Sequence, residues 1–133
     1  MKNRFTLKAY IPAKPSEVYK AWMSTKGHSA MTGSAAKVEG RVGGKFTAWD
    51  GYIFGTTKEL TPNRRILLAW RTTEFPDDAP DSQVEILLEE AKGGTKITLT
   101  HTDMPEDQMA EYRQGWEDFY FKPMREFFED KLS

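Results

Sequence analysis

The stretch Gly115–Phe128, GWEDFYFKPMREFF, decides the fold of this chain. Together with Tyr112 it holds seven of the 17 aromatic residues. At helical spacing its apolar side chains cover more than half of the circumference, whereas a surface helix needs a stripe only about 100° wide. The apolar positions are Met109, Tyr112, Trp116, Phe119, Tyr120, Met124 and Phe127, widened by Phe121, Phe128 and Leu132. This pattern predicts a long helix that is held by a curved sheet or that covers a cavity.

The residues before this stretch resemble a helix start. Asp103 is a candidate N-cap, Pro105 falls in the first turn, and Glu106 follows Asp103 at the spacing of a capping box. Within the helix, Pro123 has no N–H to donate to the carbonyl of Phe119. We therefore expect the helix to bend near Pro123, as a helix that follows a curved sheet would.

Composition limits the classes of function. The 133 residues fit one domain, residues 1–133, with a core of its own. The formal net charge of −1 indicates no basic face, so we expect no nucleic-acid partner. The absence of cysteine excludes disulfides and thiolate metal sites. No apolar run has the ~20 residues of a membrane span, and the first ten residues lack the apolar core of a signal peptide, so we expect a cytoplasmic protein.

The first third of the chain predicts a strand followed by helices. Apolar and polar residues alternate from Asn3 to Ile11, which is typical of a strand with one buried face. Pro15 suits the first turn of a helix that continues through Met23. The segment Ser24–Ser34 lacks strong periodicity and is either a second short helix or a structured loop.

From Ala35 to Thr102 the sequence has the punctuation of β-hairpins. Asp50-Gly51 separates two aromatic-rich runs, and Asp-Gly is a strong hairpin signal. Further breaks follow at Thr61–Asn63, at the acidic loop Pro76–Asp81 and at Gly93-Gly94. About six strands here and one at the N-terminus, joined by short connections, predict an antiparallel sheet. The predicted class is α+β: a curved sheet of six or seven strands wrapped around a long C-terminal helix, with one or two short helices after the first strand.

Four phrases in this order resemble the helix-grip, START-like (SRPBCC) superfamily, which includes the birch-pollen allergen and polyketide cyclases. Within it the chain is most similar to small single-domain bacterial members of the family of activators of the heat-shock protein 90 ATPase. The phrases are IPAKPSEVYKAW (Ile11–Trp22), GGKFTAWDGYIFGTTKELTPNRRILLAW (Gly43–Trp70), LTHTDMP (Leu99–Pro105) and GWEDFYFKPM (Gly115–Met124).

The resemblance implies a role in the stress response and a heat-shock chaperone as a possible partner. The eukaryotic co-chaperone resembles this sequence only in its C-terminal domain, and we expect no counterpart here of its separate chaperone-binding domain. The segment Ser24–Ser34 departs from the commoner family pattern, which places a tryptophan near this point.

Helix-grip proteins often keep a cavity under the C-terminal helix, which gives a set of candidate ligand-binding residues. Trp70, Trp116 and Tyr120 combine a large apolar body with a polar tip, so they suit either a cavity wall or a solid core. Strand parity leaves open which face several strand residues occupy. The candidate cavity-lining residues are Phe46, Phe54, Trp70, Ile86, His101, Trp116, Tyr120 and Met124.

The two histidines are the candidate titratable groups, and His101 is the only one of them that we expect to face inward. His101 shares strand parity with Ile97 and Leu99, so we expect it to face the helix, where it would act as a satisfied core residue or as a base. His28 lies in the irregular segment without a second ligand, so we expect no metal site. No cofactor motif and no nucleophile motif is present, and no catalytic residue is assigned.

Three functions remain open. The first is non-catalytic binding of a hydrophobic or aromatic small molecule between sheet and helix. The second is a protein-interaction module that regulates a heat-shock chaperone ATPase. The third is a cyclase- or hydrolase-type enzyme that uses His101 in the same cavity.

Overall fold

The computed structural model describes residues 3–132, apart from the side chain of Leu132. Its centre is a seven-stranded antiparallel sheet with the strand order β1-β7-β6-β5-β4-β3-β2. Consecutive strands pair from β2 to β7, and β1 pairs with β7, so β1 and β2 form the two edges of the sheet. The strands are β1 (Arg4–Ile11), β2 (Lys37–Val38), β3 (Lys45–Ala48), β4 (Ile53–Thr61), β5 (Arg65–Thr72), β6 (Ser82–Ala91) and β7 (Gly94–Thr102).

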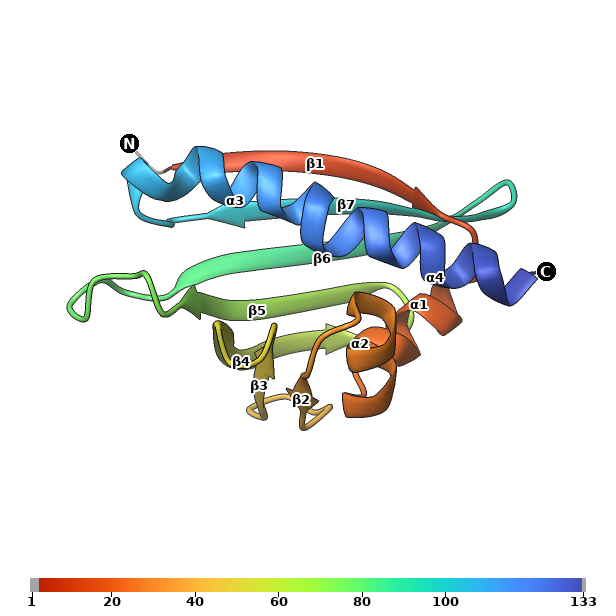
Figure 1. Ribbon diagram of the computed structural model, residues 1–133, viewed down its shortest axis with the longest axis horizontal. Coiled ribbons are helices and arrows are strands. Elements are labelled where there is room, and N and C mark those ends of the chain that lie inside the picture. Colours follow the sequence, from red (N-terminus) through yellow and green to blue (C-terminus); the bar gives the residue numbers. More distant parts are fainter. Residues whose placement is uncertain (1–2, 133) are drawn as a thin grey trace.

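One face of the curved sheet is covered by helices (Figure 1). The C-terminal helix runs obliquely across this face, and the two short helices lie beside its C-terminal end. The predicted helix-grip arrangement is confirmed. The helical elements are α1 (Pro15–Trp22), α2 (Thr25–Thr32), a 3₁₀ turn (Glu106–Gln108), α3 (Met109–Trp116), a π turn (Glu117–Phe121) and α4 (Lys122–Leu132).

The segment Ser24–Ser34, for which helix and loop were both open, contains the helix α2. Ser24 caps its N-terminus by accepting a hydrogen bond from the N–H of Gly27 at 3.0 Å. Gly33 ends it in the left-handed conformation, at φ 78°. These local end signals define a helix that apolar periodicity alone does not reveal.

The start of the C-terminal helix differs from the prediction. Asp103 has φ +67° and is not an N-cap, and its N–H donates to the carbonyl of Asn3 at 2.8 Å. The chain turns sharply at this residue, and the helix begins three residues later with a 3₁₀ turn that has no side-chain cap. The capping-box prediction is therefore wrong, because Asp103 instead makes the corner between β7 and the helix.

The helix accommodates Pro123 through a π turn. The N–H of Lys122 donates to the carbonyl of Glu117, five residues back, just before the proline that cannot donate. The extra residue in this turn rotates the apolar side, so Tyr120 and Phe121 are both buried. Phe119 is 53% exposed, which corrects its predicted place on the buried side.

The register of the sheet corrects the placement of Phe54. Phe54 pairs with Arg71 in β5, whereas its neighbours Ile53 and Gly55 pair with Thr72 and Trp70 on the helix-facing side. Because successive side chains of a strand alternate between faces, Phe54 lies on the side away from the helix. The prediction that Phe54 lines the space under the helix is wrong.

Candidate ligand pocket

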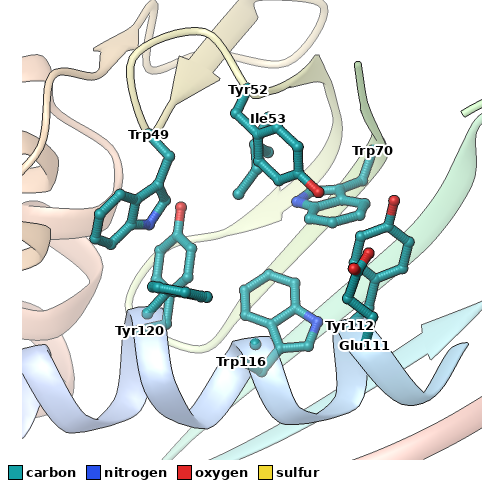
Figure 2. A pocket seen from close by; sticks show the side chains of 10 residues that line it. Trp49, Tyr52, Ile53, Trp70, Glu111, Tyr112, Trp116 and Tyr120 are labelled. Carbon is teal, nitrogen blue, oxygen red and sulfur yellow. The ribbon is translucent and has the colours of Figure 1, made fainter. Parts of the chain in front are cut away.

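A pocket of about 380 Å³ lies between the C-terminal helix, β5 and the turn that joins β3 to β4. Its size is at the lower end of the range of small-molecule sites. Figure 2 shows the rings of the turn, the strand and the helix standing around a common space. The lining residues are Trp49, Tyr52, Ile53, Trp70, Glu111, Tyr112, Gly115, Trp116, Phe119 and Tyr120.

The turn that supplies Trp49 and Tyr52 is held in an unusual conformation. Trp49, Asp50 and Gly51 all have positive φ, at 52°, 57° and 90°, which costs free energy for residues other than glycine. Two hydrogen bonds fix the turn from outside: the N–H of Asp50 donates to Ala35 at 2.9 Å, and the carbonyl of Tyr52 accepts from Thr73 at 3.0 Å. The two aromatic side chains therefore have a defined direction over the pocket.

The helix contributes three aromatic residues at four-residue spacing, and each has a polar anchor. The first is Tyr112, whose hydroxyl donates to Gln108 Oε1 at 2.5 Å and accepts from Thr72 Oγ1 at 2.7 Å. Thr72 also accepts from the N–H of Glu74, and Gln108 Nε2 donates to the carbonyl of Glu74 at 2.9 Å. These four residues form a closed ring of hydrogen bonds between the end of β5 and the helix start.

The second aromatic residue, Trp116, is anchored by His101. Its indole Nε1 donates to His101 Nδ1 at 3.1 Å, and His101 Nε2 lies 2.9 Å from Ser82 Oγ, which donates to the carbonyl of Trp70 at 2.7 Å. An indole N–H only donates, so Nδ1 is unprotonated and His101 is neutral with its proton on Nε2. Burial lowers the pKa of His101 to about 3, consistent with this state.

The third, Tyr120, is anchored by His28. The hydroxyl of Tyr120 lies 2.7 Å from His28 Nε2, and His28 Nδ1 donates to the carbonyl of Trp22 at 2.9 Å. Because Nδ1 carries the proton, Nε2 accepts from the tyrosine. Burial lowers the pKa of His28 and raises that of Tyr120, so both groups are neutral. The ring of Trp22 stacks on the ring of Tyr120, with the two centroids 4.9 Å apart.

Two further features belong to the pocket wall. The Trp49 Nε1–H is buried and has no hydrogen-bond partner among the described residues, and in Figure 2 the indole nitrogen is on the edge of the ring turned toward the pocket. A buried donor without a partner costs roughly 1–3 kcal/mol, and a ligand acceptor would recover this cost only after a movement of the indole, because the nitrogen has almost no solvent-accessible surface. The other feature is Gly115, where an added Cβ would meet only Phe119 Cδ2 at 3.6 Å. The helix thus leaves open space where any other residue would fill it.

Of the eight predicted site residues, the structure brings three together in the pocket: Trp70, Trp116 and Tyr120. Four others are buried elsewhere in the core and do not line it, which corrects their predicted place: Phe46, Ile86, His101 and Met124. Phe54 lies on the other face of the sheet. His101 does face the helix as expected, but both of its ring nitrogens are engaged, so it has no free nitrogen for a bound ligand.

The expectation that His101 is the sole inward-facing histidine is wrong. His28 is 2% exposed and contacts the helix through Tyr120, 92 residues away in the sequence. The turn residues Trp49 and Tyr52 also line the pocket, although they are not among the predicted site residues. Their signal was present, because two large aromatic side chains next to a hairpin turn expose much apolar surface unless they fold back over the sheet.

Among residues 3–132, no group of three or more histidine and carboxylate side chains comes together to hold a metal ion. None of the helices in that range combines the length and apolarity of a bilayer span.

A curved antiparallel sheet, a long helix across it and an aromatic pocket between them define a helix-grip, START-like domain. Residues 12–129 match the sequence profile of the family described as Activator of Hsp90 ATPase homolog 1-like protein. The chain belongs to this family.

Known relatives agree with this assignment. The human activator of 90 kDa heat shock protein ATPase homolog 1 is 26% identical over 125 residues, which are 94% of this chain and 37% of that protein. The Dictyostelium discoideum homolog is 29% identical over 111 residues, 83% of this chain and 29% of the relative. The chain thus spans about a third of the length of these relatives.

Solved structures show the same fold. The crystal structure of an HSP90 activator from Plasmodium falciparum superposes with a TM-score of 0.77 at 25% identity and covers 90% of both chains. The solution structure of the Aha1 dimer from Colwellia psychrerythraea gives a TM-score of 0.79 at 19% identity, covering 95% of this chain and 96% of that one.

Proposed function

We propose that this chain acts as a single, non-catalytic cytoplasmic domain that binds a hydrophobic or aromatic small molecule in the pocket under its C-terminal helix. The observation that carries the proposal is the pocket wall, in which seven of the ten lining residues are aromatic. Rings that are fixed before binding lose little conformational freedom on contact with a ligand, which favours affinity.

The polar groups of the pocket define how such a ligand would lie. The hydroxyls of Tyr112 and Tyr120 already make hydrogen bonds within the protein, and the hydroxyl of Tyr52 donates a hydrogen bond to the carboxylate of Glu74. The Trp49 N–H is a buried donor of the lining that has no partner among the described residues. We therefore expect a ligand with an apolar body between Trp70 and Trp116 and a hydrogen-bond acceptor that the Trp49 N–H reaches after a small rotation of its indole.

Binding is testable with N-phenyl-1-naphthylamine, a neutral probe that fluoresces in apolar surroundings. We expect a saturable rise in fluorescence for the unmodified chain and at least a tenfold loss of affinity in Gly115→Leu, because the new side chain fills the pocket. Ala110→Leu is the matched control, since it adds the same leucine to an exposed position of the same helix. Absence of saturation, or equal affinity in Gly115→Leu, would refute the proposal.

Family membership favours a second candidate, regulation of a heat-shock chaperone ATPase through an exposed surface. The test is the rate of ATP hydrolysis by a bacterial chaperone of the 90 kDa heat-shock class with and without this chain. Gly115→Leu separates the two functions, because it blocks the pocket and leaves the surface of the sheet unchanged. A stimulated rate that persists in this variant supports the chaperone role, and an unchanged rate with no complex at tens of micromolar rejects it.

A further inference from the structure

The pocket combines aromatic walls with negative charge at one end. Glu111 lines it directly, and the carboxylate of Glu74 accepts a hydrogen bond from the hydroxyl of Tyr52, which is also in the lining. Figure 2 places Glu111 beside Tyr112, on the side of the pocket opposite Trp49. Burial raises the pKa of Tyr112, and the negative charges of Glu74 and Glu111 raise it further, so both carboxylates are close enough to influence a pocket residue.

No positive charge offsets these carboxylates within the lining, which contains neither lysine nor arginine. The two arginines that are adjacent in sequence to lining residues make their contacts outside the pocket. Arg71, next to Trp70, pairs with Asp81 at 2.8 Å on the other face of β5. Arg113, next to Tyr112, lies over the ring of Phe5 with its Cζ 5.8 Å from the centroid. An anionic ligand would therefore meet uncompensated negative charge at the pocket.

Aromatic faces attract cations through the negative potential above the ring, and tryptophan does so most strongly. This pocket presents three tryptophans, Trp49, Trp70 and Trp116, together with tyrosine rings. A cage of aromatic rings with a carboxylate at its edge is the environment that stabilises an alkylated ammonium group. Such a group carries its charge without the tightly held water of a primary ammonium, so it enters an apolar site more readily.

Resting on the proposed function, we infer that the ligand is an organic cation: an apolar or aromatic body with an alkylated ammonium group at the Glu111 end of the pocket. Fatty acids and other carboxylates are therefore not expected as preferred ligands. The cation would have one orientation, with its acceptor at Trp49 and its positive nitrogen at the opposite side of the pocket.

Three small probes of matched shape test the charge preference: phenyltrimethylammonium, its neutral isostere tert-butylbenzene, and benzenesulfonate. Binding is followed by quenching of tryptophan fluorescence and by shifts of the indole N–H signals in NMR spectra. We expect the cation to bind at least about tenfold tighter than the neutral isostere and the anion to bind most weakly. Raising the salt concentration should narrow these differences, because partly exposed charges are screened.

Glu111→Gln should lower the ratio of the cation affinity to the neutral affinity by about three- to tenfold. Glu106→Gln is the matched control, since it removes an exposed carboxylate at the start of the same helical region and outside the lining. Equal affinities for the cation and tert-butylbenzene would overturn the charge preference and leave the proposed function standing. Failure of all three probes and of N-phenyl-1-naphthylamine would overturn both.

Discussion

The neutral state of His101 makes the stability of this domain sensitive to mild acid. In an unfolded chain a histidine titrates near pH 6.5, whereas in the folded protein the pKa of His101 is about 3. Between these two values the unfolded chain binds a proton that the folded chain does not. The free energy of unfolding therefore falls as the pH falls.

The magnitude follows from the same values. The contribution of His101 is present in full above pH 6.5 and is lost progressively toward pH 3, at about 1.4 kcal/mol per pH unit once the unfolded histidine is protonated. From pH 7 to pH 5 this one residue removes about 2 kcal/mol from the free energy of unfolding. His28, whose pKa is also lowered by burial, acts in the same direction.

The assay is urea unfolding at pH 7, 6 and 5, followed by tryptophan fluorescence. His101→Gln should be less stable at pH 7, because its amide cannot reproduce both hydrogen bonds of the imidazole. Between pH 7 and pH 5 the free energy of unfolding of this variant should fall by about 2 kcal/mol less than that of the unmodified chain. Ending at pH 5 keeps most carboxylates ionised in both states.

Ile97→Val is the matched control, because Ile97 is fully buried on the same face of the same strand. It should cost about 0.5–1.5 kcal/mol at every pH and leave the pH dependence unchanged. If His101→Gln keeps the same pH dependence as the unmodified chain, His101 is not held neutral and the hydrogen-bond chain through Trp116 is refuted.

Three further predictions concern the pocket. Gly115→Ala should raise the free energy of unfolding by about 0.5–1 kcal/mol, because it removes a helical glycine without a clash; a loss in urea unfolding would show that the position is crowded. Trp116→Phe should cost at least about 1 kcal/mol more than Trp49→Phe, because only Trp116 donates a hydrogen bond in the absence of a ligand; equal losses in thermal unfolding would contradict the assigned donors. Tyr112→Phe should cost about 1 kcal/mol and speed amide exchange at Glu74, whose N–H belongs to the same ring; unchanged exchange would exclude the ring.

The sequence was sufficient for the fold because its strongest signals were local and consistent. Strand alternation, the Asp50-Gly51 turn and the wide apolar side of the last helix each predict one element, and their order leaves few arrangements. The wrong predictions concern residues whose position depends on a partner far away in the sequence. The face occupied by Phe54 depends on its pairing with Arg71, and the role of His28 depends on Tyr120 at the other end of the chain.

The predicted apolar side of the C-terminal helix assumed a constant 3.6 residues per turn. The π turn before Pro123 adds a residue and turns Phe119 outward, so this assumption failed there. That rotation matters for the pocket, because Phe119 lines it and yet is 53% exposed. A proline that seemed only to bend the helix thus changes which aromatic residues a ligand would meet.

The polar anchors explain why the space under the helix stays open. A helix with apolar residues on more than half of its circumference could rotate or slide to bury all of them, since apolar contacts have little directionality. Tyr112, Trp116 and Tyr120 each end in a directed hydrogen bond to a different partner, so any such rotation would break three buried hydrogen bonds at once. Gly115 adds no side chain to the space that these residues line. The proposed ligand would bury the apolar surface that remains between these anchors without breaking any of the three hydrogen bonds.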